Sequence, residues 1–203
     1  MNPPEIVVFD LGKVLLDFDY SLVARRLAAR SRASVAEVQN LIDHAPLLFR
    51  FETGLMTRDE FFREVVAATG FAGDLAEFEH IFADQFTPIA PMLELHAQLR
   101  AGGVPTFIFS NTNDIAIDFI RQKFPFFAGF DDYVLSYEHG AMKPTAKLYE
   151  VVERVTGRSG AQILYVDDRL ENAEAGVARG WQVIHHLEPA ATIAQTRKLG
   201  LVK

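Results

Sequence analysis

Carboxylates follow two apolar runs of the sequence, a pattern that suggests chemistry on a bound ligand. Asp10 comes directly after Ile6–Phe9, and Asp167 and Asp168 come directly after Ile163–Val166. Short apolar runs of this kind are typical of strands that are buried on both faces of a parallel sheet. Because ligands bind at the carboxyl ends of the strands in such sheets, we expect these carboxylates to meet at one edge.

Further polar residues fall at corresponding places in the chain. Ser110 and Asn111 end the apolar run Thr106–Phe109, Lys143 precedes the next predicted helix, and Asn172 lies in the helix after the Asp pair. If these runs are neighbouring parallel strands, all of these side chains lie at the same edge of the sheet.

Taken singly, each of these residues also has a structural interpretation. Asp10 could open a turn, Ser110–Asn111 could cap a helix, and Asp167–Asp168 could begin one, where the helix dipole favours acidic residues. Lys143 and Asn172 could be solvated surface residues. Their recurrence at the ends of successive strands favours a functional site.

The residue types are those of phosphoryl transfer. The Asp10 carboxylate can attack phosphorus and form an aspartyl-phosphate. Several carboxylates at one point need a cation, and an oxygen-only ligand set suits Mg²⁺. Ser110 and the Asn111 amide would bind phosphoryl oxygens, and Lys143 would neutralise charge on nucleophile and phosphate. Asn172 would orient the metal ligands, or a metal-bound water, by hydrogen bonding to them without contacting the ion itself.

Five apolar runs, at 6–9, 106–109, 133–136, 163–166 and 181–184, alternate with helical segments after residue 87. This alternation predicts an α/β fold with a parallel sheet flanked by helices. Between Asp17 and Phe86 the sequence is typical of helices, with capping-box patterns beginning at Ser34 and Thr57 and little strand character. We therefore expect a core of residues 1–16 and 87–203 and a helical cap of residues 17–86.

The composition limits the function classes. The chain has 203 residues, of which 49% are hydrophobic, enough for one domain with a modest insertion. A net charge of −7 disfavours nucleic acid as a partner. The sequence has no cysteine and no apolar run long enough for a membrane helix, and its first residues lack a signal-peptide pattern. We expect a cytoplasmic protein without a membrane partner, either a monomer or a homodimer.

With these motifs the sequence resembles the haloacid dehalogenase-like (HAD) hydrolase superfamily. The four motifs of that superfamily match Phe9–Gly12, Ser110–Asn111, Lys143–Pro144 and Asp167–Asp168 with Asn172, in order across nearly the whole chain. The first motif also resembles the branch of small sugar-phosphate phosphatases, of the α-D-glucose-1-phosphate phosphatase type. The resemblance implies a Rossmann-like core, a helical cap inserted after the first strand, and Mg²⁺ held by Asp10, Asp167, Asp168 and the backbone carbonyl of Gly12.

Gly12 departs from the pattern of that superfamily. Most HAD phosphatases carry there a second Asp, which protonates the leaving alcohol and later deprotonates the attacking water. Glycine lacks a side chain for this task, so either the leaving group needs little help or another residue replaces the acid. Asp17, Asp19 and the histidines are candidates. Lys13 either reaches into the site or faces the cap.

Three weaker candidates remain. Glu52–Gly54 could reach a substrate, although a loop between cap helices is the simpler interpretation. The aromatic residues Phe49, Phe51, Phe61 and Phe62 could line a pocket, but aromatic residues at helical spacing usually form a core. We interpret His185–His186 as structural or surface residues, because no further metal ligands for this pair are evident.

Three hypotheses follow. The first is a Mg²⁺-dependent phosphatase that acts on a small phosphorylated metabolite, such as a sugar phosphate, through Asp10. The second is a metal-independent 2-haloacid dehalogenase, which also lacks the second Asp but leaves Asp167–Asp168 without a purpose. The third is a non-catalytic or regulatory protein that binds a phosphorylated ligand.

Overall fold

A five-stranded parallel sheet forms the centre of the computed structural model, which describes residues 3–44 and 46–203. The strand order is β5-β4-β1-β6-β7, with β1 in the middle. The expected parallel α/β sheet is therefore confirmed. The strands are β1 (Ile6–Phe9), β4 (Thr106–Ser110), β5 (Asp132–Leu135), β6 (Ile163–Asp167) and β7 (Gln182–His185).

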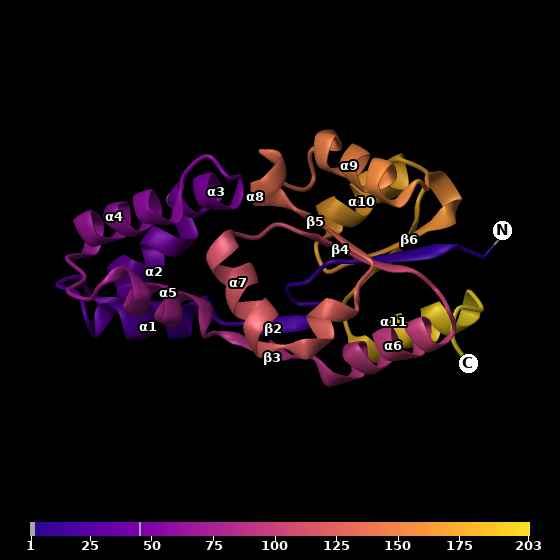
Figure 1. Ribbon diagram of the computed structural model, residues 1–203, viewed down its shortest axis with the longest axis horizontal. Helices are drawn as coiled ribbons and strands as arrows, with labels where there is room; N and C mark the ends of the chain where they lie inside the picture. The colour runs from indigo at the N-terminus through magenta and orange to yellow at the C-terminus, as the bar shows by residue number, and fades with distance from the viewer. Residues whose placement is uncertain (1–2, 45) are drawn as a thin grey trace.

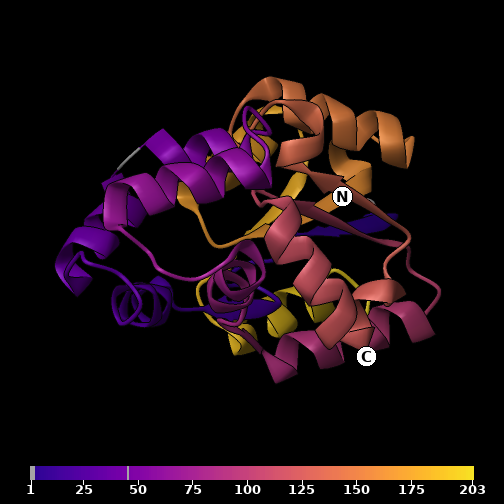
Figure 2. The same cartoon turned by 60° about the vertical axis from the view of Figure 1, so that its left-hand side comes forward.

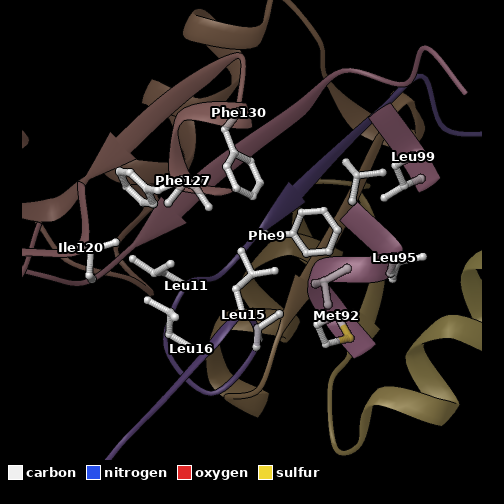
Figure 3. Packing of buried hydrophobic residues seen from close by; sticks show 14 of the residues in the cluster. Phe9, Leu11, Leu15, Leu16, Met92, Leu95, Leu99, Ile120, Phe127 and Phe130 are labelled. Atoms are coloured by element: carbon white, nitrogen blue, oxygen red, sulfur yellow. The ribbon is translucent and has the colours of Figure 1, made fainter. Parts of the chain in front are cut away.

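Helices cover both faces of this sheet, because alternate residues of β1 point to opposite sides. Val7 and Phe9 pack in the cluster that contains Met92, Leu95 and Leu99 of α6 (Figure 3). On the other face, Ile6 and Val8 pack with Tyr149 and its neighbours. Figure 1 shows α9 and α10 on one side of the sheet and α6 and α11 on the other. The core helices are α6 (Ala90–Ala101), α7 (Asp114–Lys123), α8 (Ser136–His139), α9 (Ala146–Thr156), α10 (Leu170–Ala178) and α11 (Pro189–Lys198).

In the described part of the chain between β2 (Leu16–Phe18) and β3 (Phe86–Pro88), five helices form a lobe beside the sheet, which we call the cap (Figures 1 and 2). They are α1 (Tyr20–Ala28), α2 (Val35–His44), α3 (Pro46–Glu52), α4 (Arg58–Thr69) and α5 (Leu75–Ala83). The lobe has its own apolar cluster, which Ile115 of α7 joins. The capping box expected at Thr57 is present at the start of α4.

Ion pairs and one close backbone contact fix the cap against the core. Arg58 of α4 contacts Asp114 at 2.9 Å and Asp118 at 2.7 Å, both on α7. Gly54, which follows α3, has a φ of +72°, and a Cβ atom there would lie 2.1 Å from the carbonyl oxygen of Tyr137 in α8. Glycine is therefore required where the two lobes meet.

The prediction that residues 17–86 are helical throughout is wrong at both ends. β2 (Leu16–Phe18) and β3 (Phe86–Pro88) pair antiparallel and carry the chain into and out of the cap. Each strand has three residues, too few for a period-two pattern to show in the sequence.

Other expectations differ mainly at element boundaries. The strand predicted at 133–136 begins and ends one residue earlier, because Ser136 starts α8. The strand predicted at 181–184 is shifted by one residue in the opposite direction. The sequence analysis missed α11, although Pro189 occupies its first turn, as proline commonly does. Of the described helices, none combines the length and the hydropathy needed to cross a bilayer.

Replacing Gly54 with alanine tests the contact between the lobes. Gly103 has a φ of +76° but open space around it, so Gly103→Ala is the matched control. We expect the left-handed backbone to cost each variant about 1–2 kcal/mol of unfolding free energy. The clash with Tyr137 should cost Gly54→Ala a further ~1–3 kcal/mol. Urea unfolding followed by circular dichroism measures both; equal losses would contradict the close contact.

Candidate active site

The Lys143 ammonium lies between two carboxylates at the carboxyl edge of the sheet. Its Nζ is 3.1 Å from Oδ1 of Asp10 and 2.6 Å from Oδ2 of Asp167. Nζ also donates to the carbonyl oxygen of Phe109 at 2.9 Å. All of these groups are buried. The two strand ends and the segment before α9 are thus joined through one cation, so Lys143 is not a surface lysine.

Asp168 completes the acidic group. Among the described residues, Asp10, Asp167 and Asp168 offer carboxylate oxygens that all lie within 4.8 Å of one another. One lysine balances only one of these three charges. A hard divalent cation that prefers oxygen ligands, such as Mg²⁺, fits this donor set.

Asp167 already accepts several hydrogen bonds from the protein. Its Oδ1 accepts from the Arg169 backbone N–H at 2.8 Å and from Asn172 Nδ2 at 3.0 Å. Its Oδ2 accepts from Lys143 and from the Tyr165 hydroxyl. Asn172 is 2% exposed, so it is not a helix-surface residue. Asp167 is therefore the part of the acidic group held most tightly by protein donors.

The pKa values follow from burial and from Lys143. Burial raises the pKa of Asp10 to about 8 despite the attraction of Lys143, and repulsion from the other two carboxylates adds to this effect. Burial alone would raise the pKa of Asp167, but Lys143 holds it below its ordinary value. Burial opposes the charge of Lys143, yet its carboxylate neighbours keep the pKa of this ammonium above the usual range. Lys143 alone does not supply enough positive charge to favour the ionised form of all three carboxylates.

Ser110 and Asn111 lie beside this centre, at the end of β4. The Asn111 side chain binds the backbone of Lys143 twice, accepting from its N–H at 2.7 Å and donating to its carbonyl at 3.1 Å. Ser110 is buried, and its hydroxyl has a 3.3 Å contact with the Asn111 carbonyl. The N-cap of α7 is Asn113, so Ser110 and Asn111 are not serving as the helix cap.

A cavity of about 270 Å³ opens above these residues, between core and cap. The core contributes Asp10, Lys143 and Asp168 to its lining, and the cap contributes Leu48 and Glu52, among others. Glu52 is the last residue of α3 and not part of a loop. The interpretation of Glu52–Gly54 as a plain loop is therefore wrong for Glu52.

Phe18 occupies the space where the missing acid would stand. A Cβ atom on Gly12 would lie 2.8 Å from Cε1 of Phe18. Lys13, at a φ of +57°, extends away over the same ring, with Nζ 4.5 Å from its centroid. Its Nζ contacts Asp17 Oδ1 at 2.5 Å. The side chain of position 13 thus pairs with a cap-side carboxylate.

The sequence analysis missed two functional neighbours of the site. Tyr165, which donates to Asp167, stands two residues earlier on the same strand, and side chains two apart share a face. This spacing was the available signal. Phe18 gave none, because its contact with Gly12 depends on the ribbon that β2 forms with β3.

Most of the weaker candidates pack in the protein interior or support the ends of strands and do not line the cavity. Phe51 and Phe61 stack in the cap core with centroids 4.3 Å apart, Phe62 is packed against that core, and Phe49 is 55% exposed. His186 is buried against Thr192 at 2.7 Å. The His185 ring lies 2.9 Å from the carbonyl oxygen of Asp168 and so supports the strand end.

Comparison with known proteins agrees with this geometry. The sesquiterpene phosphatase astK of Aspergillus oryzae is 24% identical over 193 residues, which are 95% of this chain and 94% of that protein. D-ribitol-5-phosphate phosphatase of Bacteroides thetaiotaomicron is 23% identical over 186 residues, 87% of this chain and 88% of that protein.

A solved HAD family enzyme from Bacteroides thetaiotaomicron, in complex with magnesium and inorganic phosphate, shares the fold. Its TM-score is 0.79 at 19% identity, over 89% of this chain and 93% of that one. The haloacid dehalogenase-like hydrolase family matches residues 4–180 of the sequence, most of the chain. Motifs, fold and family match agree: the chain belongs to the haloacid dehalogenase-like hydrolases.

Proposed function

We propose that this hydrolase is a Mg²⁺-dependent phosphatase that cleaves a small phosphorylated metabolite, such as a sugar phosphate, through an aspartyl-phosphate on Asp10. One observation supports this most directly: Lys143 stands 3.1 Å from Asp10 in a cavity that Asp168 also lines. A buried nucleophile beside a fixed cation and a cation-binding carboxylate is suited to attack on an anionic phosphate ester.

The residues divide the work. The Mg²⁺ ion would be held by Asp10, Asp168 and the backbone carbonyl of Gly12. The negative charge of Asp167 would also attract the ion, while its carboxylate holds Lys143 in place. When bound, the ion would neutralise charge on the substrate phosphate, and it would lower the pKa of Asp10 so that the carboxylate is ionised for attack. Ser110 and the Asn111 backbone amide would bind phosphoryl oxygens. Asn172 would keep Asp167 oriented, as its contact of 3.0 Å allows.

The reaction has two steps. An Asp10 carboxylate oxygen attacks phosphorus, and the bond between phosphorus and the leaving oxygen breaks. A water molecule then attacks the acyl-phosphate, which releases inorganic phosphate and restores the carboxylate. Lys143 stabilises the negative charge in both steps without moving, because Phe109 and Asp167 hold its ammonium in place.

The cavity supports a small substrate. Its volume of about 270 Å³ is near the lower end of ligand pockets in proteins. Phe18, Leu48 and Phe86 give it apolar walls, while Tyr20 and Glu52 bring polar groups from the cap. Two relatives, a sesquiterpene phosphatase and a D-ribitol-5-phosphate phosphatase, support a small phosphorylated metabolite as the substrate class.

Asp10→Asn tests the nucleophile. We expect the variant to lose at least about 10³-fold in turnover of 4-nitrophenyl phosphate with Mg²⁺, the order seen when a covalent nucleophile is removed. Asp74→Asn is the control, since Asp74 is an exposed N-cap of α5 that does not line the cavity, and asparagine caps a helix equally well. Full activity of Asp10→Asn would refute the assignment.

Removal of metal separates the phosphatase from the dehalogenase. We expect EDTA to abolish release of inorganic phosphate across a panel of phosphorylated metabolites, and added Mg²⁺ to restore it, because the carboxylates repel substrate without a cation. Chloride release from a 2-haloacid in EDTA would instead favour the dehalogenase. Stabilisation by phosphate without turnover of any ester in the panel would favour the non-catalytic binding protein.

A further inference from the structure

The present position of Phe18 leaves no free space for an acidic side chain at position 12. The Phe18 ring that lies 2.8 Å from a Cβ at Gly12 is itself packed, with centroids 5.4 Å from Tyr20 and 6.4 Å from Phe86. A carboxylate there would have to displace this aromatic group. Any proton donor for the leaving oxygen must therefore come from another element.

The candidates from the sequence do not reach the cavity. Asp17 pairs with Lys13, and Asp19 caps α1 at the Ser21 N–H. The pKa of each lies below its usual value, chiefly because of hydrogen bonding to the Lys13 side chain for Asp17 and to the Ser21 side chain and N–H for Asp19. Neither residue lines the cavity, and no histidine whose side chain is described does so.

The other titratable groups of the cavity have different tasks. Asp10, Lys143 and Asp168 form its reacting centre. The Arg169 guanidinium donates to Glu171 at 2.7 Å. Tyr20 is half-buried, and desolvation, together with the neighbouring Glu52, raises the pKa of its hydroxyl well above the ordinary value. Of the described carboxylates that line the cavity, Glu52 is the one that the proposed mechanism leaves without a role.

Contacts with the core hold Glu52 over the site. The Ser136 hydroxyl, on α8, donates to the Glu52 carbonyl oxygen at 2.5 Å, and its oxygen also lies 3.0 Å from the Thr112 carbonyl oxygen. The neighbouring Gly54 packs directly on the Tyr137 backbone. The end of α3 is thus fixed to the core segment that follows Ser110, although it belongs to the cap.

We infer that Glu52 is the general acid and base that replaces the missing aspartate. This inference rests on the proposed phosphatase function. As Asp10 attacks phosphorus, the proton of the Glu52 carboxyl passes to the leaving oxygen, and the alcohol departs. The Glu52 carboxylate then takes a proton from water as that water's oxygen attacks the acyl-phosphate. Inorganic phosphate leaves, and both carboxyl groups return to their first state.

The surroundings of Glu52 suit both roles. Burial raises its pKa to about 7, while the Tyr20 hydroxyl, by hydrogen bonding, and the Arg169 charge limit the rise. The remaining charged group of the cavity lining is Lys13, between β1 and β2, and its ammonium forms an ion pair with Asp17. Near neutral pH both protonation states are populated, as an acid that must also act as a base requires.

Two esters of similar shape separate this role from a structural one. 4-Nitrophenolate leaves without a proton, whereas the benzylic alkoxide of 4-nitrobenzyl phosphate needs one. For Glu52→Gln we expect kcat/KM on the benzyl ester to fall by about 10²–10⁴-fold. On the phenyl ester kcat/KM should be nearly unchanged, while kcat falls and a burst of nitrophenolate appears, because the second step lacks its base. Glu64→Gln, an exposed cap carboxylate, is the matched control.

The pH profile gives a second readout. Glu52 can donate its proton only below its pKa of about 7. For the unsubstituted protein, kcat/KM on the benzyl ester should therefore fall as the pH rises through about 7. Glu52→Gln should lack this fall. Equal losses on both esters, no loss, or an unchanged profile would overturn the role of Glu52. A parent that hydrolyses neither ester with Mg²⁺ would instead contradict the phosphatase function, and the role of Glu52 with it.

Discussion

The site depends on one buried ammonium group shared by two carboxylates. Lys143 fixes Asp10 and Asp167 at the ends of adjacent strands. It is held in turn by the Phe109 carbonyl and by two hydrogen bonds between its backbone and the Asn111 side chain, one in each direction. Removing one member of a buried ion pair leaves an uncompensated charge. The same interaction that organises the nucleophile therefore also stabilises the carboxyl edge of the sheet.

The core sheet could be predicted because its signals are local. Each central strand is a short apolar run, and the functional residues follow it directly in the sequence, as Asp10 follows β1 and Asp167 ends β6. A parallel sheet brings such strand ends to one edge whatever the connecting segments contain. The cluster of Asp10, Lys143 and Asp167 could therefore be predicted from the sequence alone.

The cap side of the site could not be predicted in the same way. Glu52 reaches the cavity because α3 is bound to Ser136, 84 residues later in the chain. The β2–β3 ribbon joins segments separated by the whole cap, and its three-residue strands carry no pattern of their own. Both features depend on packing between distant parts of the chain and not on the secondary-structure propensity of each segment. The periodicity of a single sequence therefore cannot predict them.

The close approach of Phe18 to Gly12 also couples the two positions. A single change of Gly12 to aspartate would meet a packed aromatic ring, and a single loss of that ring would leave a hole beside Lys13 and Tyr20. Residues in such contact have coupled effects on stability. The effects of substitutions at positions 12 and 18 on the free energy of unfolding should therefore be non-additive, because the size of one side chain sets the space left for the other.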